Sequence, residues 1–138
     1  MTDRSALPAP VFTLDFKVRD YEVDAEGIVN NARYLNYMEH TRHEFCAMAG
    51  LSFARMRELK MSPVVRKVEI EYIRSLGLGE KFTSSLDLRR EGARFIFRQW
   101  IVNADGQLIA DALITVVNVI DGRPSRGEEF AEAFAAYL

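Results

Sequence analysis

A single long amphipathic helix, followed only by strand-like segments and short helices, most limits the folds open to this chain. From Asn31 to Ala49 the apolar residues recur at spacings near three and four, and polar residues fill the gaps. This period is typical of a helix with one buried face. Asn30 is a suitable cap before the helix, and Gly50 stands where a left-handed residue would close its last turn. The apolar stripe of this helix needs a sheet face to cover it.

Alternation of apolar and polar residues predicts the strands of that sheet. Val11–Arg19 alternates in this way before the helix, and four segments follow it: Val64–Arg74, Lys81–Glu91, Arg94–Asn103 and Gln107–Ile120. The joins between these four segments are short and carry turn residues, so we expect hairpins between antiparallel neighbours. The expected fold is α+β, with one long helix laid across a five-stranded antiparallel sheet whose last four strands form a meander.

Two shorter helices are expected beside the long one. Ser52 can cap a helix over Phe53–Lys60. Ser125 and Glu128 form a Ser-x-x-Glu pattern, which predicts a capping box and a helix within residues 125–138. This terminal helix is expected to cover an edge or flank of the sheet.

The composition limits the class of protein. Of the 138 residues, 49% are hydrophobic, and no repeat or linker divides them, so residues 1–138 are predicted to form one domain with residues 1–10 as a flexible tail. A formal net charge of −2 shows no basic excess and argues against nucleic acid or an anionic membrane as the main partner. No apolar run approaches the ~18 residues of a spanning helix, and the first ten residues resemble neither a signal nor a transit peptide. Because Cys46 is the only cysteine, no intramolecular disulfide can form, and we expect a cytoplasmic protein.

The segment between the first strand and the long helix carries the candidate chemistry. It places Asp24 a few residues before the helix, with Gly27 between them. First-turn amides of a helix lack intrahelical acceptors and carry partial positive charge, so they can hold an oxyanion. A carbonyl carbon between these amides and Asp24 would be polarised on one side and would face a nucleophile or general base on the other. The structural alternative is that Asp24 caps the loop or helix, while Gly27 only permits a positive φ.

The same segment resembles the signature of hotdog-fold thioesterases of the 4-hydroxybenzoyl-CoA thioesterase type. That signature has an acid, one spacer, the catalytic Asp and then a Gly-hydrophobic-Val-Asn-Asn-x-x-Tyr run, which matches Glu22 to Tyr34. The similarity continues on the helix as Tyr37-x-Glu39-x-x-Arg42. The resemblance implies a sheet wrapped around the helix, a homodimer or homotetramer whose subunits pair their sheets, and active sites at the subunit interface.

The resemblance also implies the roles of the loop residues. Asp24 takes the role of the catalytic carboxylate, and the backbone N–H of Asn31 polarises the thioester carbonyl. Gly27, Ile28 and Val29 form the adjoining turn. Many relatives have Gly-His-Val here, and Ile28 removes that imidazole. We therefore expect Asp24 itself to act as nucleophile or as base toward water.

Two further acids have alternative roles. Glu39 is expected to face the acyl pocket, as the helix acid of the family does, or else to form a surface ion pair with Arg42 or His43. Glu22 stands where the family commonly has Asp, and we expect it to organise the loop rather than to take part in catalysis.

Substrate contacts are expected from an aromatic residue and from a basic turn. Tyr34 is a candidate for the acyl pocket. Arg89, Arg90 and Arg94 cluster around a turn between two strands, and Arg90 and Arg94 are the candidates for the CoA phosphates, to which arginine binds in bidentate fashion. Alternatively, such charges keep the edge of a sheet from pairing further.

The predicted function is hydrolysis of acyl-CoA thioesters to a free carboxylic acid and CoA. No cofactor is expected, because the reaction needs only a placed carboxylate or water and a stabilised oxyanion. No metal is expected either, since His40 and His43 are the only histidines. Two alternatives stay open: hydrolysis of acyl groups on an acyl carrier protein, and a hotdog protein that binds acyl thioesters without hydrolysing them.

Overall fold

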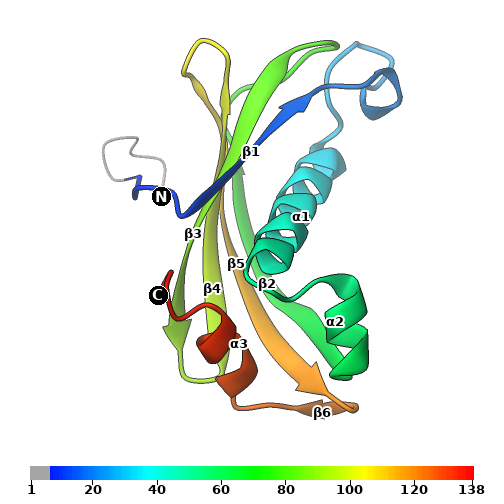
Figure 1. Cartoon of the computed structure of the whole chain (residues 1–138). Helices are drawn as coiled ribbons and strands as arrows, with labels where there is room; N and C mark the ends of the chain where they lie inside the picture. The colour runs from blue at the N-terminus through cyan, green and yellow to red at the C-terminus, as the bar shows by residue number, and fades with distance from the viewer. Residues whose placement is uncertain (1–6) are drawn as a thin grey trace.

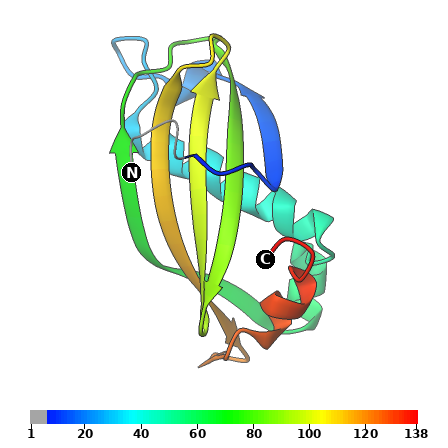
Figure 2. The same cartoon turned by 90° about the vertical axis from the view of Figure 1, so that its left-hand side faces the viewer.

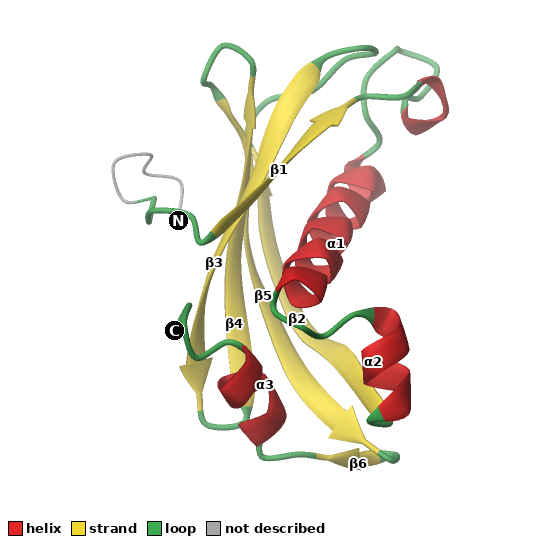
Figure 3. Ribbon diagram, in the orientation of Figure 1, coloured by secondary structure: helices red, strands yellow, loops and turns green. Residues whose placement is uncertain are grey.

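The structure, a computed structural model, describes residues 7–138 and consists of a curved antiparallel sheet with one long helix across it (Figures 1 and 2). Its elements in chain order are β1 (Phe12–Lys17), the 3₁₀ helix η2 (Asp20–Glu22), α1 (Asn31–Met48), α2 (Phe53–Glu58), β2 (Met61–Tyr72), β3 (Lys81–Glu91), β4 (Arg94–Asn103), β5 (Leu108–Ile120), β6 (Arg123–Pro124) and α3 (Glu128–Ala133). Most of the predicted tail, residues 1–10, lies outside the described residues. Figure 3 shows that the strands form a layer on one side of α1.

The strand order corrects the predicted meander. The strands lie in the order β1-β3-β4-β5-β2, and the two-residue β6 pairs with β5, so the sheet has six strands instead of five. Only β3, β4 and β5 form a meander. β2 pairs antiparallel with β5, with Met61 opposite Ile120 and Tyr72 opposite Ala110. The glycine-containing connection after β2 crosses the sheet instead of closing a hairpin, because β5 and β4 lie between β2 and β3. Its residues hydrogen-bond to the loop before α1.

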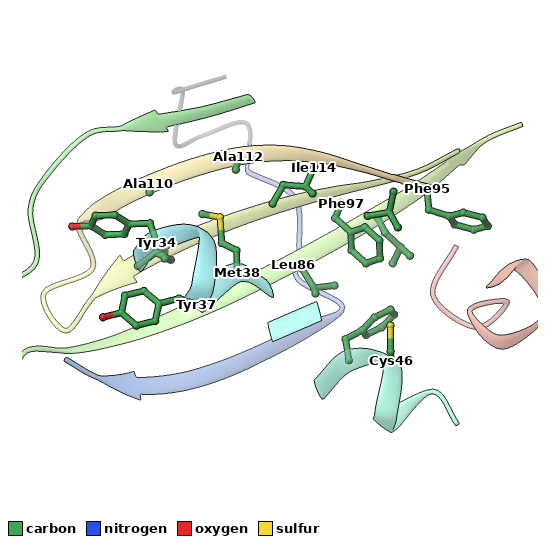
Figure 4. Packing of buried hydrophobic residues seen from close by; sticks show 14 of the residues in the cluster. Tyr34, Tyr37, Met38, Cys46, Leu86, Phe95, Phe97, Ala110, Ala112 and Ile114 are labelled. Atoms are coloured by element: carbon green, nitrogen blue, oxygen red, sulfur yellow. The ribbon is translucent and has the colours of Figure 1, made fainter. Parts of the chain in front are cut away.

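The core lies between α1 and the inner face of the sheet. The buried residues of α1 are Tyr34, Tyr37, Met38, Thr41, Phe45 and Cys46, which recur at the predicted helical spacing. Figure 4 shows several of these side chains beside Leu86, Phe97, Ala110, Ala112 and Ile114 of the strands. Met38 and Phe45 have no exposed surface, and full burial of such a side chain contributes about 1.5–3 kcal/mol.

The local signals at the two earlier helices are confirmed. The Ala32 N–H donates to Asn30 Oδ1 at 2.9 Å, and Gly50 has a φ of +93° after the end of α1. Ser52 caps α2, since its side chain accepts a hydrogen bond from the Arg55 N–H at 3.2 Å. α2 ends at Glu58, two residues earlier than predicted.

The capping box predicted near the C-terminus is wrong. α3 begins after Gly127, which has a φ of +89°, and the helix occupies only part of residues 125–138. The Ser125 hydroxyl instead donates to Glu129 Oε1 at 2.7 Å and accepts from the Gly127 N–H at 2.8 Å. The left-handed Gly127 turns the chain before the helix starts, so the helix begins too late for Ser125 to be its cap.

β2 forms an edge of the sheet and is largely exposed on both faces. Val64, Val65, Val68 and Tyr72 expose 40–43% of their surface. Since β2 pairs with β5 on one side only, the described chain leaves its other edge without a partner strand. A long, apolar, exposed edge of this kind is a template for pairing with another chain.

Candidate active site

The loop before α1 is a closed turn held by its own backbone. Val23 and Val29 form an antiparallel bridge across it. The Asp24 N–H donates to the Ile28 carbonyl at 2.9 Å, and the Gly27 N–H donates to the Asp24 carbonyl at 3.0 Å. Gly27 has a φ of +79°, a conformation that L side chains adopt only with strain. Residues 24–28 therefore have a defined geometry.

The Asp24 side chain is exposed and oriented by two backbone amides. Its Oδ1 accepts from the Glu26 N–H at 2.8 Å and from the Ile28 N–H at 3.4 Å. Among the described residues nothing hydrogen-bonds to Oδ2. The predicted structural role of Asp24 in the loop is thus observed, and it leaves one carboxylate oxygen open to a ligand.

The start of α1 presents one unused hydrogen-bond donor. Asn30 Oδ1 accepts from the Ala32 N–H, and the Asn30 carbonyl accepts from the Arg33 N–H at 2.9 Å. The hydrogen bonds of the described chain leave the Asn31 N–H without an acceptor, and Asn31 is exposed. This amide lies at the positive end of an 18-residue helix, so it can bind an oxyanion.

Glu22 connects the Asp24 loop to α1 through buried hydrogen bonds. Its side chain is only 5% exposed and accepts hydrogen bonds from the Arg19 N–H at 2.8 Å, from Arg19 Nη2 at 3.2 Å and from the Tyr37 hydroxyl at 3.0 Å. Burial acts to raise the pKa of Glu22, but the hydrogen bonds outweigh burial and hold it below its usual value. Burial and the bond to Glu22 raise the pKa of Tyr37. These contacts agree with the predicted loop-organising role.

The connection between β2 and β3 supports the loop from the other side, and apart from its glycines no sequence pattern indicated this contact. The Val29 N–H donates to the Leu76 carbonyl at 2.9 Å, and the Leu78 N–H donates to the Gly27 carbonyl at 3.3 Å. Tyr34 belongs to this support. Its ring is 2% exposed and its hydroxyl accepts from the Leu76 N–H at 3.1 Å. In the described chain Tyr34 is thus an almost fully buried core residue.

Glu39 lies at a different place, at the mouth of a pocket of about 570 Å³ that we call the α1–α2 pocket. The pocket is lined by Glu39, Arg42, His43, Cys46, Phe53, Met56, Arg57, Lys60, Met61, Ser62, Pro63, Val65, Phe97, Val116, Phe130 and Phe134. Within the described chain Glu39 forms no ion pair with Arg42 or His43. It lies eight residues along α1 from Asn31, about 12 Å at the helical rise. One chain therefore does not bring Glu39 to Asp24.

The arginines at the β3–β4 turn are also far from Asp24 within one chain. Lys81, at the start of β3, pairs with Lys17 just before the loop, whereas Arg90 lies near the far end of this strand, roughly 30 Å away at the strand rise. The Arg90 side chain donates to the carbonyls of Gly92 and Arg126, at 2.8 and 3.0 Å, and to Glu128 Oε1 at 3.0 Å. It thereby fastens α3 to the sheet.

Arg94 differs from Arg90 in its surroundings. It is exposed at the start of β4, opposite Glu91 in the strand register. Its guanidinium is therefore the more accessible of the two predicted phosphate ligands.

Other candidate chemistry is limited. No group of three His, Cys, Asp or Glu side chains within residues 7–138 could hold a metal ion, and His40 pairs with Glu44 at 3.8 Å. Burial raises the pKa of Cys46 to about 12, so this thiol is a packed core group, as predicted. No helix in the described part of the chain is long and apolar enough to cross a membrane.

Comparison with known proteins identifies the family. The family model of the thioesterase-like superfamily matches residues 18–138, which include the loop, α1 and every strand after them. A long-chain acyl-CoA thioesterase of Escherichia coli K12, FadM, is 37% identical over 103 residues, 73% of this chain and 77% of the relative. A chloroplastic acyl-acyl carrier protein thioesterase of Arabidopsis thaliana, ATL3, is 32% identical over 95 residues, 68% of this chain. The chain spans about half the length of that plant relative, 50%.

The fold agrees with solved structures of the family. The crystal structure of YbaW, a probable thioesterase from Escherichia coli, superposes with a TM-score of 0.77 at 30% identity and covers 92% of this chain and 98% of that one. The hotdog fold implied by the residues around Asp24 is thereby confirmed. Because the match takes in the Asp24 loop, the long helix and the strands that follow it, the chain belongs to the thioesterase-like superfamily.

Proposed function

We propose that this protein hydrolyses acyl-CoA thioesters to a free acid and CoA at the junction of the Asp24 loop and α1. The observation that carries the proposal is the unused Asn31 N–H beside a loop that leaves Asp24 Oδ2 open. The identity to FadM, named a long-chain acyl-CoA thioesterase, supports this substrate class. The reaction needs no cofactor, and the single cysteine, Cys46, fits a cytoplasmic location.

The geometry suits an acyl transfer to water. The thioester oxygen accepts from the Asn31 N–H, where the α1 dipole stabilises the charge that develops on it. Asp24 then acts in one of two ways. As nucleophile it attacks the carbonyl carbon, the C–S bond breaks, the CoA thiolate takes a proton from water, and water hydrolyses the anhydride. As base it removes a proton from water, which attacks the carbon, and the proton passes to the leaving thiolate.

The exposed edge of β2 supports a homodimer as part of this proposal. A second copy that adds to this edge about a two-fold axis runs antiparallel to it and continues the sheet. Both copies of α1 then lie on the same face of the joined sheet. The exposed Val64, Val68 and Tyr72 side chains would be covered.

Such a dimer joins the two halves of the site. The Tyr72 hydroxyl donates to the Asn31 carbonyl at 3.2 Å, so the start of α1 lies at the Tyr72 end of β2. The α1–α2 pocket includes Met61 and lies at the opposite end of the strand. In an antiparallel pair the Tyr72 end of one strand adjoins the Met61 end of the other. Asp24 and Asn31 of one subunit would thus face the α1–α2 pocket of the other subunit, together with Glu39 at its mouth.

Thiol release from short, medium, long and aromatic acyl-CoA esters tests the function. We expect wild type to turn over at least one ester, and Asp24→Asn to lose about 10²–10⁴-fold in kcat. The Asn side chain can keep the bond from the Glu26 N–H, so the loop should stay folded. Turnover unchanged in Asp24→Asn would overturn the assignment of this carboxylate.

Acyl carrier protein substrates are the second candidate, favoured by the identity to the plant protein. Turnover of acyl carrier protein esters only, with a KM that rises with salt, would select this function. Binding of acyl-CoA without any turnover would select a binding protein.

A further inference from the structure

Arg42 is a partly buried cation that forms no ion pair in the described chain, although the charge of Glu39, one turn away on α1, acts on it. Its Nη1 donates to Gln99 Oε1 at 2.8 Å, and this neutral amide is the acceptor that the structure provides. Gln99 has no exposed surface and is itself fixed by a bond from its Nε2 to the Met38 carbonyl at 2.9 Å. Burial lowers the pKa of Arg42 from its usual value. A desolvated guanidinium is stabilised most by an anion, and a carboxylate fits its planar fork.

Arg42 forms part of the wall of the α1–α2 pocket. Most of the lining is apolar, including Met56, Phe97 and Phe134. Its charged residues are three cations, Arg42, Arg57 and Lys60, and one acid, Glu39. Glu39 is exposed at the mouth, whereas Arg42 reaches Gln99 in the interior. The pocket thus has an apolar passage with a cation at depth, and its 570 Å³ volume is that of a small-molecule site.

The position of Arg42 sets the length of a ligand. Gln99 is on β4, and the sheet order β4-β5-β2 puts it two strands in from the β2 edge. This is roughly 10 Å at the spacing of neighbouring strands. In the proposed dimer the partner's Asp24 loop adjoins that edge, so an acyl chain of medium length would reach from the thioester to Arg42.

We propose that the α1–α2 pocket holds the acyl chain and that Arg42 binds a carboxylate at its far end. The substrate class is then the CoA monothioesters of medium-length dicarboxylic acids. This inference rests on the proposed hydrolysis of acyl-CoA, to which it adds a specificity-determining residue. The apolar lining accommodates the methylene chain, and the guanidinium distinguishes a terminal carboxylate from a terminal methyl group.

The test compares suberyl-CoA with octanoyl-CoA, which differ at the far end of an eight-carbon chain. We expect wild type to have the higher kcat/KM for suberyl-CoA, and Arg42→Met to lower the suberyl-to-octanoyl ratio about 10- to 100-fold, mainly through KM, as for a lost bond between charged groups. Arg55→Met removes a cation of α2 that pairs with Glu58 at 3.0 Å and does not line the pocket, and it should keep the wild-type ratio.

Each outcome separates this inference from the function on which it rests. If wild type has the same kcat/KM for octanoyl-CoA and suberyl-CoA, or if Arg42→Met lowers both values equally, the inference fails. The proposed acyl-CoA hydrolysis is then retained. If wild type hydrolyses neither these nor any other acyl-CoA, the proposed function fails. Arg42→Met removes a partner of Gln99, so its melting temperature is measured first. If that variant does not fold, the wild-type ratio and Arg42→Lys, which keeps a cation but not the fork, decide the question.

Discussion

The two halves of helix α1 offer a ligand different kinds of group. At its N-terminal end the groups are backbone amides and one carboxylate, held by a loop that closes on itself between Val23 and Val29. In its C-terminal half the groups are side chains, and Arg42, Met56 and Phe97 come from three separate elements to form the α1–α2 pocket. In the proposed function the first half supplies chemistry that any acyl thioester can use, and the second half selects the acyl chain.

This difference has a physical origin. The Asp24 loop is closed by bonds between residues close in sequence, such as the Gly27 N–H to the Asp24 carbonyl at 3.0 Å, and the β2–β3 connection adds bonds at Gly27 and Val29. A short motif can therefore specify it. The pocket depends on how α2 and β2 pack beside α1, which many sequences can achieve with different side chains.

A loss comparable to that of Asp24→Asn is expected from a variant that tests whether the N-terminal half depends on backbone geometry. Gly27→Pro should lower kcat about 10²–10³-fold, because proline fixes φ near −65° and removes the N–H that bonds to Asp24. Thiol release with the best acyl-CoA measures it. Gly122→Pro, at a positive φ of +80° in the distant β5–β6 turn, is the control. An equal loss in both variants would point to general instability instead of a misplaced loop.

A mixing experiment tests whether the two halves work together across subunits. Two variants are used, and each is expected to be nearly inactive. Asp24→Asn removes the carboxylate, and Ser62→Trp places a large side chain at an exposed position that lines the α1–α2 pocket. Co-refolded in equal amounts, they should recover about a quarter of wild-type activity, because half of the dimers then contain one intact site. No recovery would mean that Asp24 and the pocket of the same chain form one active site. Light scattering on each variant checks that it is dimeric.

The buried acid beneath the loop gives a pH effect on stability. The pKa of Glu22 in the folded protein lies below its ordinary value of about 4.5. Its contribution to the free energy of unfolding is therefore present at neutral pH. It is lost as the pH falls from about 4.5 through the pKa of the folded protein. Glu22→Gln should therefore be less stable than wild type at neutral pH and change less in stability between about pH 6 and about pH 3. Urea unfolding at several pH values measures both. Parallel curves for the two proteins would contradict the role of Glu22.

The smallest effect concerns the cap of α1. Asn30→Ala should cost about 0.5–2 kcal/mol of stability, since Oδ1 no longer accepts from the Ala32 N–H. Activity should fall only severalfold if the Asn31 amide keeps its place. Thermal unfolding and thiol release are measured on the same sample, with Ser52→Ala, the cap of α2, as the matched control for stability. A drop in kcat as large as that of Gly27→Pro would show that the cap also positions the donor.

Sequence patterns were sufficient for the long helix, for most strands and for the family. The predicted bounds of β3 and β4, the Asn30 cap and the motif around Asp24 all depend on neighbours in the chain, and the structure confirms these elements and the cap. The family implied by the motif is confirmed as well. The predicted roles of Asp24, Asn31 and Glu39 stay predictions until the variants are measured.

Tertiary structure alone decided the rest. Hairpin signals could not reveal that β2 pairs with β5, because pairing between distant strands depends on the whole sheet. Tyr34 is buried against Leu76, and Arg90 bonds to α3, so both side chains have structural partners, while their predicted substrate contacts stay predictions. The sequence by itself determined what forms through local hydrogen bonds and periodicity: the strands, the long helix and the Asp24 loop. Only the folded chain determined which distant side chains meet, since those contacts arise when the sheet curves around α1 and leaves β2 at its edge.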